Sequence, residues 1–339
     1  MSRATIKDVA REAGVSPSAV SRVFTQGASA SAKTRERVMA AAERLNYRPS
    51  LLARGLVGSR TNLITLVMGS LADPFDALFL DTFSQAMAAR GTRLLLASAT
   101  SNEPQDSGLL QALDYRSDAV VIAAGTLSPA HSELCVKAGL PVILAGRVLD
   151  APGVDSVLAD NRGGGRQAAE LLIRTGCRRL AYLGRGGATF SDRERFAGFA
   201  AAARAAGLKV IDQAVAQRDD TATFQASTAL LTGDSRPDGL FCGADSLAIP
   251  AIEAARALGL GVPEEISVVG FNNVPNAAWR SFRLTTLDYP VGQVVEDILA
   301  LIDSRFSDPL RDNEVRRIAT QLVVRTTTRQ RPPQETAAS

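Results

Sequence analysis

The side chains best suited to contact a nucleic acid lie within one stretch near the N-terminus. Ser16, Ser18 and Ser21 carry hydroxyls, Arg22 carries a guanidinium, and Pro17 is compact. Hydroxyl and guanidinium groups bind phosphate oxygens, and an arginine can read the edge of a guanine in the major groove. Small side chains let the backbone approach the duplex closely. The residue types from 16 to 22 therefore predict a surface that binds DNA.

Two short helices would position these residues. Thr5 and Asp8 form a capping-box pattern at the start of the first helix, and Gly14 ends it. Ser16 as N-cap and Pro17 at the first helical position start the second helix. Apolar residues recur at helical spacing in both segments: Ile6, Val9, Ala10 and Ala13, then Val20, Val23 and Phe24. Two short helices joined by a turn that contains glycine predict a helix-turn-helix motif.

A third helix, capped by Ser31, would complete a small core with Val38, Ala41, Ala42 and Leu45. Residues 1–60 hold eleven Lys or Arg against four Asp or Glu, a net charge of +7, whereas the remainder carries −4. A small basic unit on a slightly acidic body is typical of a DNA-binding module joined to a regulatory domain. A helical mini-domain with a solvated basic surface is the alternative. This DNA-binding unit, the headpiece, is expected to span residues 1–48.

Residues 49–61 follow as a predicted hinge. Pro49 and Ser50 can start a helix, but only one or two turns remain before Gly58, and Gly55 weakens them by roughly 1 kcal/mol relative to alanine. A basic helix of marginal stability can become ordered on DNA, with Leu56 wedged between base steps in the minor groove. A flexible linker is the other interpretation. Both interpretations can hold, the flexible linker for the free protein and the helix for the protein bound to DNA.

The sequence pattern changes at Leu63. Short runs of branched apolar residues alternate with helical segments, which predicts parallel sheets covered on both faces. The predicted strands are residues 63–68, 92–97, 119–123, 141–144, 156–159, 179–183, 239–242 and 266–270, and the predicted helices are 73–90, 105–113, 129–138, 163–175, 192–206, 221–232, 246–258 and 291–303. We expect an α/β core of two doubly wound lobes over residues 62–330, with ligands bound between the lobes. Residues 331–339 are polar and are predicted to be a disordered tail.

Several motifs resemble one family of regulators. Residues 5–10 (TIKDVA), 15–23 (VSPSAVSRV), 33–38 and 45–49 resemble the headpiece of the lactose/galactose repressor (LacI/GalR) family, and residues 73–75, 160–163, 193–199 and 263–271 resemble its core. The resemblance implies a small all-α headpiece on a core like that of periplasmic sugar-binding proteins, with the chain crossing between lobes near residues 159–161, 287–290 and 317–321. It implies these DNA contacts: phosphates with Thr5, Ser16, Ser21 and Arg22, bases with Pro17, Ser18 and Arg22, and intercalation by Leu56.

The same resemblance implies an effector site between the lobes. It places a ligand-clamping arginine at Arg195, for which a surface ion pair with Glu194 or Asp192 is the alternative. At position 272 this chain has Asn272 where the family usually has an aspartate that accepts sugar hydroxyl protons. Asp245 can either cap its helix or line the cleft. The remaining expected effector contacts are Phe75, Asp76, Arg147 and Trp279. For Trp279, packing on its loop is the alternative to stacking on the ligand.

These expectations together predict a function. The chain is expected to be a cytoplasmic transcriptional repressor that binds operator DNA through both grooves, as a homodimer or a tetramer, and responds to a sugar or sugar acid. Ala244 and Tyr289 stand where Asn and Gln are common in the family, and additional arginines favour an anionic effector. No cofactor, metal ion or membrane partner is expected.

Two other classes of protein are disfavoured. A nucleotide-binding enzyme would explain the glycine-rich residues 184–187, but neither G-x-G-x-x-G nor G-x-x-x-x-G-K-[ST] is present, and His131 is the only histidine. Cys135, Cys177 and Cys242 lie far apart and show no disulfide or metal-ligand spacing. A secreted sugar carrier would need a signal peptide, and residues 1–13 lack its apolar region. No run approaches the eighteen apolar residues of a membrane span.

Overall fold

The structure, a computed structural model, describes residues 4–24, 29–48, 60–69, 71–98, 107–123, 129–214, 219–233 and 235–330. The chain divides into two compact units, Met1–Asn62 and Leu63–Ser339. The predicted hinge falls almost entirely outside the described residues, as do Leu56 and the predicted tail, residues 331–339. Within the described part of the chain, no helix is both long and apolar enough to cross a membrane.

The first unit contains three helices, α1 (Ile6–Ala13), α2 (Pro17–Phe24) and α3 (Ala32–Arg44). The predicted capping box is confirmed, because Thr5 N donates to Asp8 Oδ2 (2.9 Å) and Asp8 N donates to Thr5 Oγ1 (3.4 Å). Gly14 ends α1 with a φ of 61°, in the left-handed region that glycine adopts without strain. The helices meet over Val9, Val20 and Val38, which are fully buried. Each such side chain contributes about 1.5–3 kcal/mol of hydrophobic stabilisation.

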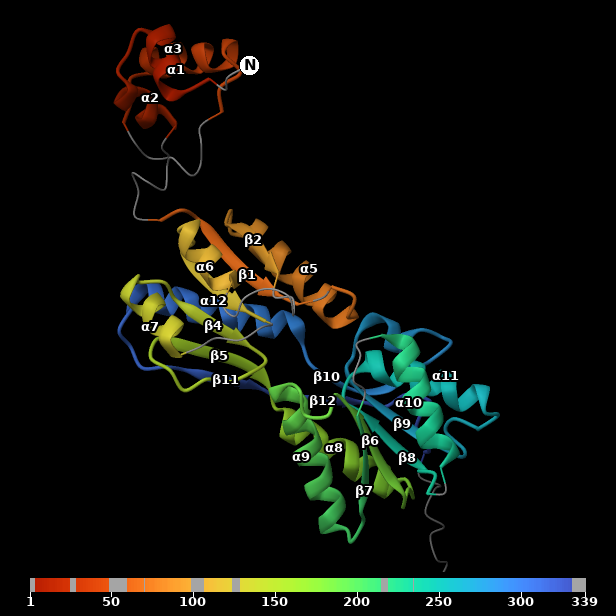
Figure 1. The fold of residues 1–339 in the computed structure, drawn as a ribbon. Helices are drawn as coiled ribbons and strands as arrows, with labels where there is room; N and C mark the ends of the chain where they lie inside the picture. Colours follow the sequence, from red (N-terminus) through yellow and green to blue (C-terminus); the bar gives the residue numbers. More distant parts are fainter. Residues whose placement is uncertain are drawn as a thin grey trace, which may run out of the picture. The chain divides into compact units, whose positions relative to one another are not determined.

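The second unit begins with a six-stranded, all-parallel sheet in the order β11-β5-β4-β3-β1-β2. Its strands are β1 (Leu63–Met68), β2 (Arg93–Ser98), β3 (Ala119–Ile122), β4 (Val142–Ala145), β5 (Val154–Ala159) and β11 (Val315–Ile318). The helices α5 (Pro74–Ala89) and α12 (Val291–Ser307) share one hydrophobic cluster on one face, and α6 (Ser107–Asp114) and α7 (Pro129–Lys137) share another. This sheet and its four helices form the first lobe (Figure 1).

A second six-stranded sheet has the order β12-β10-β9-β8-β6-β7. Its strands are β6 (Leu180–Gly184), β7 (Val210–Ala214), β8 (Gly239–Cys242), β9 (Ser267–Asn272), β10 (Thr285–Asp288) and β12 (Gln321–Val323), of which β12 runs antiparallel to β10. The helices α8 (Asn161–Arg174) and α9 (Phe190–Ala205) contribute to one core cluster, and α10 (Asp220–Thr232) and α11 (Asp245–Ala257) to the other. These elements form the second lobe (Figure 1).

The chain passes between the lobes three times, where the sequence predicted. The passages are from β5 to α8, from β10 to α12 and from β11 to β12. The prediction of two doubly wound lobes is therefore confirmed. Four strands lie outside the predicted set: β7, β10, β11 and β12.

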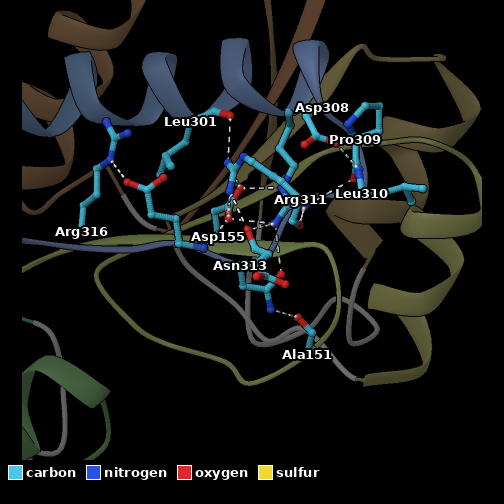
Figure 2. Close-up of polar contacts among 12 residues, drawn as sticks. Ala151, Asp155, Leu301, Asp308, Pro309, Leu310, Arg311, Asn313 and Arg316 are labelled. Atoms are coloured by element: carbon cyan, nitrogen blue, oxygen red, sulfur yellow. Dashed lines mark hydrogen bonds and ion pairs between the residues drawn. The ribbon is translucent and has the colours of Figure 1, made fainter.

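A buried ionic cluster fixes the loop between α12 and β11 in the first lobe. Asp155 on β5 is fully buried and accepts paired hydrogen bonds from Arg305 of α12 and from Arg311. Its Oδ1 also accepts a hydrogen bond from Glu314 N (2.7 Å). Figure 2 shows Asp155 and Arg311 facing each other beneath α12. The cluster pins the loop that leads from α12 into β11.

Candidate functional site

The predicted DNA-contacting residues of the headpiece lie mainly on its surface. Thr5, Ser16, Pro17, Ser18 and Arg22 are exposed, and Ser21 is half-buried. Ser16 Oγ accepts a hydrogen bond from Ala19 N (3.2 Å), as the predicted N-cap of α2 should, and lies 2.9 Å from Ser18 Oγ. The opposite side of α2 buries Val20 and Val23. The outer face of α2 is thus small, hydroxyl-rich and basic, as a helix that enters the major groove requires.

Part of the basic charge of the headpiece has structural partners. Arg35 Nη1 donates to Val23 O (3.0 Å), and Arg37 Nη2 donates to Ala13 O at the C-terminal end of α1. Arg44 pairs with Glu12 (3.1 Å). All three arginines are still exposed, and only Arg44 pairs with an acid, so Arg35 and Arg37 keep their positive charge at the surface.

A cavity in the core has a volume of about 600 Å³ and is lined by both lobes. It lies at the carboxyl ends of the strands, where doubly wound sheets bind ligands. Five of the seven predicted effector contacts line it: Phe75, Asp76, Arg147, Arg195 and Asn272. The two others, Asp245 and Trp279, are not among its lining residues.

Arg195, in the second turn of α9, lines this cavity. It is 8% exposed, and its guanidinium donates to Asn161 Oδ1 (2.8 Å), to Gly243 O and to Asn272 Oδ1 (3.4 Å). The guanidinium carbon lies 3.6 Å from the centre of the Phe271 ring, a cation–π contact. Burial lowers the pKa of Arg195, and the nearby Tyr182 and Tyr289 oppose that shift.

The surface ion pair that was the alternative for Arg195 is absent among the described residues. Glu194 pairs instead with Arg162 (3.0 Å). Asp192 accepts hydrogen bonds from Tyr182 Oη (2.7 Å), from Arg185 N (3.1 Å) and from Gly187 N (2.8 Å). Asp192 thereby fixes the glycine-rich residues 184–187 against α9, a role that sequence reasoning missed.

Asp245 belongs to the framework of the second lobe and not to the cavity wall. Its carboxylate accepts hydrogen bonds from Thr286 Oγ1 (2.6 Å) and Val274 N (2.9 Å) and is fully buried. Burial raises the pKa of Asp245 to about 7 against the opposing effect of these hydrogen bonds. Neither interpretation from the sequence describes this role, because Asp245 joins α11 to β10 and to the loop after β9.

Trp279 likewise lies outside the cavity lining. It follows the short 3₁₀ helix Pro275–Ala278 and is 56% exposed. The chain leaves β9 through Asn272 (φ 109°) and Asn273 (φ 53°), two consecutive residues in the left-handed region. This turn redirects the chain, so proximity to Asn272 in sequence does not bring the indole into the cavity.

The wall from the first lobe is aromatic. The rings of Phe75 on α5 and Tyr289, before α12, stack at a centroid distance of 5.5 Å, and both residues line the cavity. Two hydrogen bonds connect the lobes beside it, from Ser246 Oγ to Asp73 Oδ2 (3.0 Å) and from Ser191 Oγ to Gly146 O (2.9 Å). A ligand here would contact both lobes and a flat apolar surface.

The fold and cavity define a class of protein, a two-lobed ligand-binding core that carries a helix-turn-helix headpiece. Residues 5–50 match the family described as bacterial regulatory proteins, lacI family, and residues 169–328 match the periplasmic binding protein-like domain. The chain is 33% identical to HTH-type transcriptional regulator GalR of Escherichia coli (strain K12), over 89% of this chain and 90% of the relative. It is 26% identical to catabolite control protein A of Priestia megaterium, over 96% and 99%. The chain belongs to the LacI family of bacterial transcriptional regulators.

Solved structures agree on the fold. A complex of the transcriptional regulator CelR with cellobiose matches with a TM-score of 0.69 and 28% identity, covering 96% of this chain and all of the other. The lac repressor dimer bound to operator and the anti-inducer ONPF matches with a TM-score of 0.82 and 24% identity, covering 97% of this chain and all of the other. The second likeness supports the fold alone.

Proposed function

We propose that this chain is a transcriptional repressor whose affinity for an operator is controlled by a sugar or sugar acid bound in the cavity between the lobes. The observation that carries the proposal is the presence, in one chain, of an exposed basic helix-turn-helix face and a cavity of about 600 Å³ lined by both lobes. The chain acts in the cytoplasm as a homodimer, which places two headpieces on a pseudo-palindromic site.

The proposed contacts divide into two groups. On DNA, Thr5, Ser16, Ser21 and Arg22 hold phosphates, Pro17, Ser18 and Arg22 face base edges, and Leu56 enters the minor groove. In the core, the effector is proposed to contact Phe75, Asp76, Arg147, Arg195 and Asn272, which line the cavity.

Control of DNA binding follows from a cavity shared by two lobes. A ligand that contacts both lobes favours the arrangement in which those contacts form, and it shifts the equilibrium only by its difference in affinity for the two arrangements. The three interlobe passages and the bonds from Ser246 and Ser191 are the connections that such a shift would change. The hinge at residues 49–61 transmits the change to the headpiece.

The direct test measures operator and ligand binding separately in the full chain. After in vitro selection of an operator, Arg22→Ala should weaken binding at least about fivefold, since a bidentate contact to guanine contributes about 1–3 kcal/mol of discrimination. The matched control is Arg204→Ala, which removes an exposed charge from α9 in the core and should leave operator affinity unchanged. Equal operator affinity for the wild type and Arg22→Ala would contradict the proposal.

The relatives named above are regulators, and we propose that this chain is likewise not an enzyme. A compound that raises the unfolding temperature of the protein by binding to its folded state should be recovered chemically unchanged after prolonged incubation. Its conversion to a product would support the enzyme alternative.

A further inference from the structure

The buried charge of Arg195 has only neutral hydrogen-bond acceptors around it. These are two side-chain amide oxygens, of Asn161 and Asn272, and the carbonyl oxygen of Gly243. Among the residues that the structure describes, no carboxylate forms an ion pair with this guanidinium, although it is more than nine-tenths buried. Removing a cation from water is costly, and amide oxygens recover less of that cost than a carboxylate does.

Two acids that line the cavity, Asp192 and Asp73, already have their own hydrogen-bond partners. Both oxygens of Asp192 accept hydrogen bonds, Oδ1 from Tyr182 Oη and Oδ2 from the backbone amides of Arg185 and Gly187. Both oxygens of Asp73 accept as well, from Phe75 N (3.0 Å) and from Ser246 Oγ (3.0 Å). These carboxylates are poorly placed to accept further hydrogen bonds from the hydroxyls of a neutral polyol.

Arginines, in contrast, form much of the remaining polar wall. Besides Arg195, the lining includes Arg147, Arg185 and Arg193, against the acids Asp73, Asp76 and Asp192. Two of those three acids hold α5 and the glycine-rich loop in place through the bonds just described. Arg193 also has a structural partner, Gly187 O (2.8 Å), but by formal charge the four arginines of the lining outnumber its three aspartates.

A helix N-terminus adds to this positive potential. Gly243, Ala244 and Leu247, at the start of the thirteen-residue helix α11, line the cavity. Ala244 is the N-cap and provides no side-chain hydrogen bond to the first turn. The dipole of a helix favours an anion near its N-terminus. Arg195 donates to Gly243 O, so the guanidinium and the N-terminus of α11 meet at the same part of the wall.

On the basis of the proposed function, we propose that the effector carries an anionic group, which binds at the Arg195 guanidinium and the N-terminus of α11. A cavity of about 600 Å³ is within the usual range for small-molecule sites, about 300–1,000 Å³. The stacked Phe75 and Tyr289 provide a face for the C–H groups of a sugar ring. The ligand class is an acidic monosaccharide, whose charge comes from a carboxylate or from a phosphate.

The experiment is calorimetric titration of the full chain with matched pairs of compounds. Galacturonate is compared with galactose, and glucuronate and glucose 6-phosphate are each compared with glucose. At least one anionic compound should bind, with an affinity at least about tenfold above that of its neutral partner. The carboxylate and phosphate compounds distinguish the two sources of charge.

A charge substitution tests whether binding occurs at Arg195. Asn272→Asp nearly preserves shape and puts a carboxylate where an amide oxygen lies 3.4 Å from Arg195 Nη2. This substitution should weaken the binding of the anionic compound at least about tenfold. Asn161→Asp places the same charge on the opposite side of the guanidinium and should act likewise, which provides a second variant if the first fails to fold. The control is Gln111→Glu, which adds an equal charge at an exposed position of α6 and should leave the affinity for the compound unchanged.

Three outcomes would overturn the inference: equal binding within every pair, binding of neutral sugars alone, or no binding by any of the probes. A further contrary result is an anionic compound whose affinity both charge substitutions leave unchanged. The proposed function is tested apart from this, because selection of an operator and its loss in Arg22→Ala do not depend on the charge of the effector.

Discussion

A single methyl group between α8 and α9 should disturb both the stability of the core and the position of Arg195. Gly165 of α8 lies directly against the carbonyl oxygen of Arg195, and Gly198 of α9 lies against the carbonyl oxygen of Arg162, so a Cβ at either glycine would overlap backbone. Backbone atoms cannot rotate away as a side chain can. Gly165→Ala therefore requires the two helices to separate.

The expected magnitude follows from two opposing effects. Alanine gains about 1 kcal/mol over glycine in a helix interior, whereas overpacking a filled core costs about 1–3 kcal/mol. Because the overlap is with backbone, we expect the upper end of that cost, and a net loss of about 2 kcal/mol. For a unit of this size that loss lowers the unfolding temperature by roughly 4–8 °C. Separation of the helices also moves Arg195 from Asn161, so binding of the effector should weaken.

The assay is thermal unfolding of the purified chain, followed by circular dichroism. Gly292→Ala is the matched control, since this α12 glycine has no atom within 4 Å of an added Cβ and is exposed. It should leave the unfolding temperature equal or slightly higher. If Gly165→Ala unfolds at the wild-type temperature or above, the close approach of α8 and α9 is not a constraint on the fold and the reasoning fails.

The remaining predictions concern the ionic cluster, the hinge and the headpiece. Asp155→Asn leaves the buried Arg305 without its carboxylate and should cost about 3 kcal/mol or more in chemical denaturation; a loss below about 1 kcal/mol would contradict this. Burial alone would raise the pKa of Asp155, but hydrogen bonds from Arg305, from Glu314 N and from Arg311 outweigh it and hold the pKa below its usual value. The stabilisation is thus fully present above the unfolded pKa of about 3.9 and is lost as the pH falls through the lower folded value, so the difference between wild type and Asp155→Asn should narrow below about pH 4. Leu56→Ala should reduce operator affinity and DNA bending in a gel-shift assay, and unchanged bending would refute intercalation. Thr5→Ala should lower headpiece stability by about 1 kcal/mol, whereas Thr5→Ser, which keeps the capping oxygen, should not.

Local chemistry made much of the fold predictable. The caps at Thr5, Ser16 and Ser31 and the continuous apolar strands depend on residues a few positions apart, and the structure has them as expected. Strand β11 (Val315–Ile318) was missed because its residues are mostly exposed at a sheet edge, and its pairing with β5 joins segments more than 150 residues apart. No apolar periodicity marks such a strand.

The candidate site was likewise predictable from the sequence only in part. Asn272 is the last residue of β9, and Arg195 lies in the second turn of α9, the helix after β6, so the topology of the sheet brings both to the cavity. The role of Asp245 depends on Thr286, 41 residues away, and the exposure of Trp279 depends on the turn at Asn272 and Asn273. Such distant contacts and backbone turns have no signal in local sequence.

The most direct test of the account is the affinity of the full chain for its selected operator, measured by fluorescence anisotropy with and without a compound that binds the core. We expect that affinity to fall steeply with salt, as phosphate contacts require, and to change at least about fivefold when the core is saturated with ligand, the usual lower range of allosteric coupling. An operator affinity that is the same with the cavity filled and empty would contradict the claim that this cavity controls DNA binding.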